Sequence, residues 1–352
     1  TRSDYVSRIG QSKNEGGAIF INSLFPVSDK TEIYAFGGLN YRLGESTAFR
    51  RQPAQLHQTV ASIYPNGFLP LIETNNYDRS LSAGIRSEIN GWKVDFSNTY
   101  GNNTIDFGVK NTVNASMKES SPTSFEAGGY RFTQNTTNLD FTRFFENTLD
   151  GINVAFGGEF RYENYQIVGG EEASYANYGK VRQIGVDGNG KPIYVQDFNG
   201  NINTLFAANG TALAGGAQSF PGFLPANEVN ANRHSVAAYL DTEFNFSKDF
   251  LVAAALRYED YSDFGSTLNG KISTRYKLGN YVLRAAASTG FRAPSLHQLY
   301  FSATSSLFLD GSISNSGTFT NDSRAAKLLG IPELNEEKSK SVSAGFTANW
   351  GK

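Results

Sequence analysis

The chain has 352 residues and a formal net charge of −2, from 31 Lys and Arg against 33 Asp and Glu. This balance provides no basic surface for nucleic acid, and the absence of Cys excludes disulfides, thiolate metal sites and Cys nucleophiles. Phe (27), Tyr (18) and Gly (36) are abundant whereas Met (1) and Pro (10) are few, a composition that favours strands joined by turns over helices.

Neither end of the chain resembles a natural terminus. Residues 1–10 contain no start Met and no apolar segment of a signal peptide, and the chain stops at Lys352 directly after a strand-like segment. We therefore expect a fragment of a longer protein. The longest strongly apolar run in any candidate strand, Leu251–Leu256, is too short for a transmembrane helix.

Apolar and polar residues alternate with a period of two along most of the chain. In the segment 31–43, for example, Ile33 and Tyr41 share one face while Glu32 and Arg42 share the other. We predict about eleven strands, many of them long enough to cross a bilayer at a tilt. Their predicted spans are 17–27, 31–43, 77–90, 92–107, 128–147, 151–167, 232–246, 250–261, 267–277, 280–289 and 337–350.

Short and long connections between these strands alternate along most of the chain. Short ones carry tight-turn residues, as at Asn90-Gly91 and at Leu278-Gly279-Asn280. The long ones span 44–76, 167–231 and 290–337. Outer-membrane barrels have short periplasmic turns and long extracellular loops, so this alternation predicts an all-β protein, an antiparallel transmembrane β-barrel.

No metal site is predicted. None of the three histidines (His57, His234 and His297) has a second His at metal-ligand spacing, so we interpret them as rim or interface residues. The segment 187–198 begins like a calcium loop but lacks the ligands at its fifth and twelfth positions, which favours a Gly-rich turn. The acidic cluster at 259–263 could hold a cation at a barrel rim, but an ordinary solvated loop is favoured.

No enzyme motif is found either, since the chain has no G-x-S-x-G, no P-loop and no G-x-G-x-x-G that opens a helix. Acidic pairs such as Glu159 with Glu163, or Asp241 with Glu243, share a strand face at a spacing that could pair acids for glycoside hydrolysis. Lys and Arg share the same faces, so a hydrated lumen wall is favoured and no catalytic residue is predicted.

The long loops carry a pattern of their own. Two segments, 63–70 and 220–225, combine aromatic residues with Pro and Gly, a composition that suits adaptable recognition surfaces. Such loops either grip the apolar or ring faces of a ligand or pack on one another and roof the barrel, and the sequence favours neither role. The candidate ligand contacts are Tyr64, Phe68, Phe220, Phe223, His297 and Tyr300. One short helix is expected at Ala325–Leu329, capped by Asp322 or Ser323.

The segment that follows the strand 281–289 reads Gly290-Phe291-Arg292-Ala293-Pro294-Ser295-Leu296. It resembles the G-F-R-A-P-S-L segment of TonB-dependent outer-membrane receptors. The resemblance continues at Leu334–Ser339, which is similar to the L-x-x-E-x-S approach to a barrel strand, and at Tyr258–Ile272, which is similar to the hairpin upstream. Other segments, such as 135–140 and 156–161, resemble members from Bacteroidota.

The resemblance implies a barrel of about 22 strands, closed by an N-terminal plug, that imports scarce nutrients with energy relayed by TonB. Residues 1–352 would then be one β-barrel domain, the middle part of such a barrel, and the plug and further strands are expected in the intact protein. The implied ligand is a metal chelate such as a siderophore, a cobalamin-like compound or an oligosaccharide. The implied partners are the TonB complex, reached through the plug, outer-membrane lipid and a surface lipoprotein; no cofactor is implied.

Within the motif, Gly290 permits a turn and Pro294 weakens regular strand pairing, so we interpret the segment as a structural corner of the barrel. Arg292 is expected to anchor the base of the loop to carboxylates in the lumen. Two other functions stay open, a passive porin and a secreted β-rich protein that binds or cleaves glycans. The second would place many large apolar side chains in water.

Overall fold

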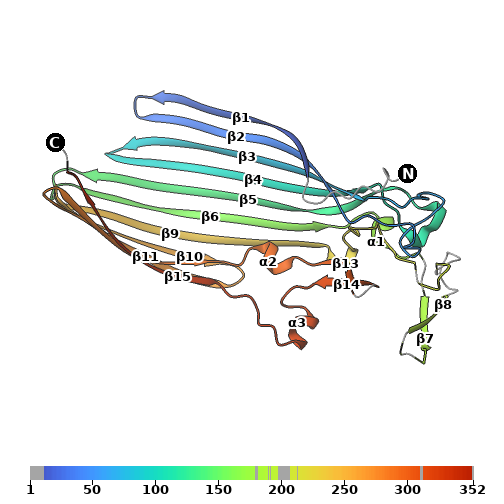
Figure 1. Cartoon of the computed structure of the whole chain (residues 1–352). Helices are drawn as coiled ribbons and strands as arrows, with labels where there is room; N and C mark the ends of the chain where they lie inside the picture. The colour runs from blue at the N-terminus through green and yellow to red at the C-terminus, as the bar shows by residue number, and fades with distance from the viewer. Residues whose placement is uncertain are drawn as a thin grey trace.

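The computed structural model describes residues 12–178, 181–188, 190, 192–196, 207–211, 213–309 and 312–350. One antiparallel sheet of 11 strands dominates it, in the order β1-β2-β3-β4-β5-β6-β9-β10-β11-β12-β15 (Figure 1). Its strands are β1 (Lys13–Ser28), β2 (Thr31–Thr47), β3 (Leu71–Ile89), β4 (Trp92–Lys110), β5 (Ser124–Phe145), β6 (Ile152–Val168), β9 (Val229–Ser247), β10 (Phe250–Tyr261), β11 (Gly265–Leu278), β12 (Tyr281–Arg292) and β15 (Glu337–Ala348).

The sheet confirms the predicted all-β class and the predicted strands, although several of them extend further than expected. β3 begins at Leu71 rather than at residue 77, and β5 begins at Ser124 rather than at residue 128. The added part of β3 reads Leu71-Ile-Glu-Thr-Asn-Asn76 and pairs fully with residues 105–110 of β4. Its polar residues fall on both faces, so the period-two pattern disappears there while the backbone ladder continues.

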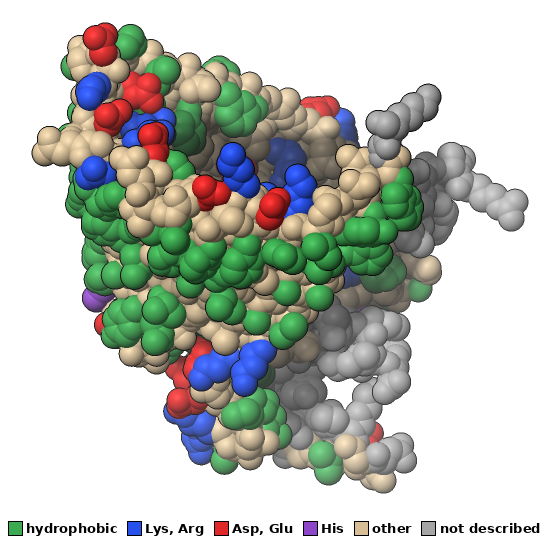
Figure 2. Space-filling view, turned by 90° about the vertical axis from the view of Figure 1, so that its left-hand side faces the viewer, with side chains coloured by type: hydrophobic (Ala, Val, Ile, Leu, Met, Phe, Trp, Pro, Cys, Tyr) green, Lys and Arg blue, Asp and Glu red, His purple; other side chains and the backbone are tan. Residues whose placement is uncertain are grey.

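The two faces of the sheet differ in chemistry. Residues directly opposite each other on paired strands share a face, and the register places Ile33, Ile85 and Phe96 side by side on the convex face. The same register places Glu32, Arg86 and Asp95 together on the concave face. Figure 2 shows the result: hydrophobic side chains cover the outside, and charged side chains line the hollow inside. The convex face is thus the lipid side, and the concave face is the lumen side.

Short turns lie at one end of the sheet and most of the long loops at the other, as predicted (Figure 1); the β10–β11 connection at residues 262–264 is a short one at the loop end. At the first end, Asn90 and Gly91 have φ values of 51° and 79°, the two positive values that a tight hairpin turn requires. The loops at the other end contain η2 (Ala115–Ser120), α1 (Glu172–Tyr175), β7 (Val181–Val186), β8 (Pro192–Gln196), η3 (Pro225–Asn227), α2 (Leu296–Tyr300), β13 (Ala303–Leu309), β14 (Ser312–Thr318) and α3 (Arg324–Leu328).

The predicted loop helix is present as α3. Ser323 is its N-cap and accepts a hydrogen bond of 3.2 Å from the Ala326 N–H, while Gly330 follows the helix with a φ of 71°. The hairpins β7–β8 and β13–β14 and the helix α2 were not predicted. No helix in the described part of the chain is long and apolar enough to cross a membrane.

Buried apolar side chains are concentrated among the loops rather than between layers of the sheet. They form three small clusters, each built where a loop covers the outer ends of the strands. Of the candidate positions in the segment 187–198, Asn189, Lys191 and residues 197–198 lie outside the described residues. The outer, loop-covered end of the lumen is therefore the part of the fold in which a site can be built.

Candidate functional site

An aromatic cluster, here called the roof cluster, joins the loops to the lumen wall at the outer end of the sheet. Its buried members are Tyr165 and Ile167 of β6, Phe223 of the loop before β9, and Leu296 of α2. Lumen-facing rings of the neighbouring strands pack against them, notably Phe107, Tyr130 and Phe132. The segment around Phe220 and Phe223 before β9 and the helix α2 after β12 thus fold inward over the lumen wall.

Helix α2 brings the family-like motif into this cluster. Ser295 caps the helix and accepts from the Gln298 N–H at 3.2 Å, and the Gln298 side chain accepts in return from the Ser295 N–H at 2.9 Å. Pro294 precedes the cap, where the chain leaves the extended strand. Leu296, the first helical residue, is 1% exposed. The segment is therefore a corner that turns the chain from strand β12 into the lumen.

His297 lies among aromatic rings on the exposed side of α2. Its ring stacks on Phe301, with 4.8 Å between centroids, and meets the rings of Tyr165 and Tyr130 edge-on at 5.5 and 5.9 Å. Partial burial lowers the pKa of His297 below its ordinary value, so the ring is neutral at neutral pH. The arrangement presents an apolar, ring-lined surface with a neutral imidazole.

The six predicted ligand contacts fall into two groups. Phe220, Phe223, His297 and Tyr300 converge on the roof cluster. Tyr64 and Phe68 lie in a separate cluster with Val60 and Val113, under the loop that joins β2 to β3. Phe68 and Phe223 are 2% and 5% exposed, so these two side chains serve packing. Tyr64, Phe220, His297 and Tyr300 stay partly or fully exposed.

The residue that anchors the motif is Arg233 of β9, not Arg292. Arg233 is 4% exposed; its Nη2 lies 2.6 Å from Oε2 of Glu163, and its Nη1 donates to the Pro294 carbonyl at 2.7 Å. Asp263 is 3.6 Å away on the other side. Arg292 is exposed and is in no ion pair with any described residue, so the expectation for Arg292 was wrong.

The positions of the two arginines in the sheet explain why Arg233, and not Arg292, makes this contact. Arg233 and Glu163 are directly opposite each other on paired strands, and both point into the lumen. Arg292 is the last residue of β12, opposite Glu337 of the edge strand β15, and its side chain is exposed. The signal that identifies Arg233 is its inward position on β9, but it is usable only once the pairing of β6 with β9 is known.

A second ion cluster lies below the first. Arg161 and Arg257 both contact Glu159, at 2.6 and 3.3 Å, and Arg257 also contacts Glu259 at 2.6 Å. Glu159 and Glu259 thus each have a guanidinium partner, which supports the interpretation of Glu159 as part of a charged lumen wall rather than of a glycosidase acid pair. Within the described residues, no group of three or more acidic or His side chains is placed to hold a metal ion.

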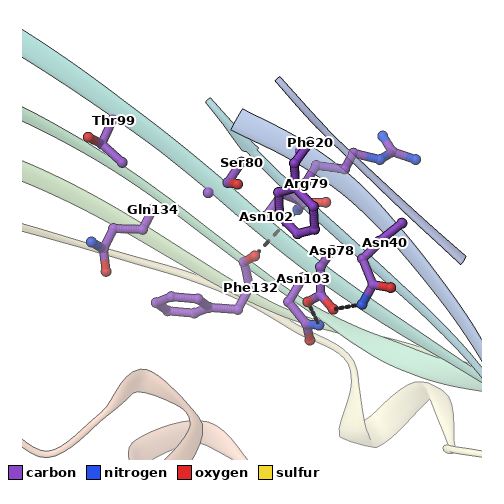
Figure 3. A pocket seen from close by; sticks show the side chains of 13 residues that line it. Phe20, Asn40, Asp78, Arg79, Ser80, Thr99, Asn102, Asn103, Phe132 and Gln134 are labelled. Atoms are coloured by element: carbon purple, nitrogen blue, oxygen red, sulfur yellow. Dashed lines mark hydrogen bonds between the residues drawn. The ribbon is translucent and has the colours of Figure 1, made fainter. Parts of the chain in front are cut away.

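A lumen groove of about 730 Å³ lies farther along the wall, across β1 to β5 (Figure 3). Phe20 and Phe132 line it, and between them Asp78 accepts hydrogen bonds from Asn40 at 3.1 Å and from Asn103 at 2.6 Å. Ser80, Thr99, Asn102 and Gln134 add hydroxyl and amide groups to the lining. The composition of the loops does not predict this groove, because its residues come from five separate strands.

Comparison with known proteins places this geometry in a family. A family model described as TonB dependent receptor-like, beta-barrel, matches residues 20–352. Among solved structures, the siderophore receptor PirA from Acinetobacter baumannii superposes with a TM-score of 0.58 at 12% identity, covering 97% of this chain and 41% of that chain. The RagAB peptide transporter superposes with a TM-score of 0.56 at 10% identity, covering 96% of this chain and 38% of that chain.

The PirA receptor from Pseudomonas aeruginosa gives a TM-score of 0.50 at 10% identity and covers 96% of this chain and 50% of that chain. At these identities the likeness concerns the fold. The chain spans between 38% and 50% of the length of these three structures. No curated protein sequence matches the chain.

Proposed function

The chain belongs to the TonB-dependent receptor β-barrel family of the bacterial outer membrane, and from this premise we propose that it forms part of an active transport receptor. In this proposal, extracellular loops capture a scarce nutrient, which then passes through a plugged barrel with energy relayed by TonB. The family is one of receptors and transporters, and the scheme needs no covalent chemistry. The plug, the contact with the TonB complex and the strands that close the barrel would belong to other parts of the protein.

The observation that carries the proposal is the inward-folded roof cluster. Loops that pack on the lumen wall, held by a buried Arg233–Glu163 pair, make a structured outer chamber rather than an open mouth. A chamber of that kind suits capture of a specific ligand better than free diffusion. The proposed ligand contacts are the exposed rings of this cluster, those of Phe220, His297 and Tyr300, together with Tyr64 of the separate cluster under the β2–β3 loop.

We propose a metal chelate such as a siderophore as the first ligand class to test, followed by cobalamin-like compounds and oligosaccharides. Support for this order comes from the PirA structures, which are siderophore receptors by name. The RagAB structure, a peptide transporter by name, adds peptides to the panel. A surface lipoprotein that covers the outer chamber, and outer-membrane lipid around the convex face, are the further proposed partners.

Electrical conductance of the intact protein in a planar bilayer tests the proposal against its main alternative. A plugged receptor should conduct almost no ions, whereas a passive porin should give stable open channels. Binding of a ferric siderophore panel to the same preparation, followed by tryptophan or tyrosine fluorescence, tests the capture step. Large, ligand-independent conductance together with no binding would contradict the proposed function and favour a porin.

A further inference from the structure

The lumen faces of β11 and β12 carry cationic side chains and no acidic ones. Four residues form what we call the lumen cation strip: Lys271, Arg275 and Lys277 of β11, and Arg284 of β12. Their inward direction follows from the alternation, because Ile272, Tyr276 and Leu283 are among the exposed apolar side chains of the convex face. All four cationic side chains are exposed to the lumen.

The charges of the strip are uncompensated in the described structure. None of the four residues is in an ion pair with a described residue, in contrast to Arg86 of β3, Arg161 of β6, Arg233 of β9 and Arg257 of β10. Neither β11 nor β12 contains Asp or Glu. Asp241 of β9, the inward carboxylate level with Lys271, is two strands away from β11, or about 10 Å at the usual spacing of strands. Lys277 is nearer to an acidic residue, because its N–H donates to the carbonyl of Asp249 in the turn before β10 at 2.7 Å.

The register makes this arrangement unfavourable unless an anion is present. Arg275 and Arg284 are directly opposite each other on paired strands, and like charges in that position repel. Two guanidinium groups held side by side in a hollow with low-dielectric walls also focus a positive potential. Their planar donor groups match the oxygens of carboxylates and phosphates, which accept two parallel hydrogen bonds.

The space around the pair has the size of a small-molecule site. Lys271, Arg275 and Arg284 line a groove of about 450 Å³ whose remaining lining is largely small, with Ser273, Ala286, Ser343 and Gly345 among its residues. Volumes of this order are usual for small ligands. Because the neighbouring side chains are small, the cationic groups project beyond them and are accessible to an anion that moves along the lumen.

The strip extends along the lumen, from the loop end of the sheet towards the end with the short turns. Lys271 lies nearest the loops, Arg275 and Arg284 share the next level about 13 Å further on, at roughly 3.3 Å per residue, and Lys277 lies close to the turn at 279–280. At the outer end, Arg292 faces Glu337 across β12 and β15. The cations therefore follow one another from the base of the roof towards the periplasmic end of the sheet.

We propose that the lumen cation strip is a binding site for a small anion with several carboxylate or phosphate oxygens, and that the transported ligand carries such groups. The second half of this statement rests on the proposed transport function. The first half concerns the lumen wall alone. An acidic polypeptide segment is the competing occupant, and the experiment separates the two.

The experiment uses the intact, detergent-solubilised receptor with inorganic pyrophosphate as the probe, measured by titration calorimetry at low salt. The wild-type protein should bind pyrophosphate, and Arg275→Gln with Arg284→Gln should weaken the affinity by about tenfold or more. Lys248→Gln is the matched control, since it removes one positive charge from an exposed turn outside the lumen and should leave the affinity unchanged within about twofold. Binding should weaken as salt rises.

Two results would overturn the proposal. One is pyrophosphate binding that the double variant does not weaken, which would place the site elsewhere. The other is no binding by the wild-type protein; a lower unfolding temperature of the double variant would then identify an acidic polypeptide segment as the occupant. If the receptor imports its ligand but fails these tests, only the proposed anion site is refuted. If it binds pyrophosphate as expected but imports no ligand, only the proposed transport function is refuted.

Discussion

Replacing Arg233 with Ala should release α2 from the lumen wall. The substitution leaves Glu163, which is 8% exposed, without its guanidinium partner, and removes the hydrogen bond to the Pro294 carbonyl. Breaking a buried pair by removing one partner costs about 3–5 kcal/mol, and we take the lower end, about 3 kcal/mol, because the lumen side is hydrated. The part of this free energy that holds α2 in place is that of one charge-assisted hydrogen bond, from Arg233 to the Pro294 carbonyl, or about 2 kcal/mol.

Hydrogen exchange at the α2 amides measures that share directly. The Leu299 N–H donates to the Ser295 carbonyl at 3.1 Å and the Phe301 N–H to the His297 carbonyl at 2.9 Å. A loss of about 2 kcal/mol corresponds to an increase in their exchange rates of about 30-fold. Arg233→Lys keeps the charge but not the paired geometry, so its effect should be intermediate.

Arg292→Ala is the matched control, because Arg292 is exposed and lies four residues before the α2 start. Its exchange rates should match those of the wild-type protein, with an effect on stability within about 0.5 kcal/mol. Faster α2 exchange in Arg292→Ala, with no change in Arg233→Ala, would refute the anchoring role of Arg233. In that case Arg292 would be the anchor after all.

Three further changes test the loops. Leu296→Ala, at a residue 1% exposed, should cost about 2–3 kcal/mol of unfolding free energy in urea titrations, and a cost near zero would mean that the roof cluster does not form. Burial lowers the pKa of His297 from its ordinary 6.5, so the stability that the neutral ring contributes is present above pH 6.5 and is lost as the pH falls below it. Hydrogen exchange of the α2 amides, corrected for intrinsic rates, should therefore be faster at pH 5 than at neutral pH in the wild-type protein. The acceleration should be smaller in His297→Phe. Gly67 has a φ of 69°, and a Cβ added there would collide with the Arg51 carbonyl oxygen. Gly67→Ala should therefore lower the unfolding free energy by about 2 kcal/mol or more and speed proteolysis of residues 48–70. In the control Gly101→Ala the new Cβ meets open space, so neither the stability nor the proteolysis of residues 48–70 should change.

The strands were predictable because one of their faces meets lipid and the other meets water. In β6, Ile152, Phe156 and Phe160 fall on the convex face and Glu159 and Arg161 on the concave one, a contrast that a period of two makes visible. The contrast fails where both faces are solvated, as in residues 71–76, and there the prediction stopped too early. Backbone pairing continues in such a segment without any pattern in the side chains.

The candidate site was predictable in its residue types but not in its geometry. The aromatic loop residues Phe220, Phe223, His297 and Tyr300 were identified individually, yet only the folded loops show that they meet at Tyr165. The burial of Phe223 likewise depends on which loop covers it. Interactions between distant segments leave no periodic pattern in the sequence. The composition of a loop can therefore indicate candidate residues but cannot predict which of them are in contact.

The choice between Arg292 and Arg233 shows the same limit. A motif drew attention to Arg292, whereas the contact belongs to an arginine in another strand that the register places opposite Glu163. The lumen cation strip is similar, because the opposition of Arg275 and Arg284 is visible only in the pairing of β11 with β12. In both cases the deciding information is the alignment of strands, which the hydrophobic pattern constrains only to the correct face.

Ligand uptake by cells that express the intact receptor, with and without a functional TonB complex, tests the central claim most directly. Labelled ferric siderophores, cobalamin and oligosaccharides form the panel. The account predicts that at least one of them accumulates inside cells with TonB and stays at the level of surface binding in cells without it. Equal accumulation in both strains would contradict energised import and indicate passive diffusion through an open barrel.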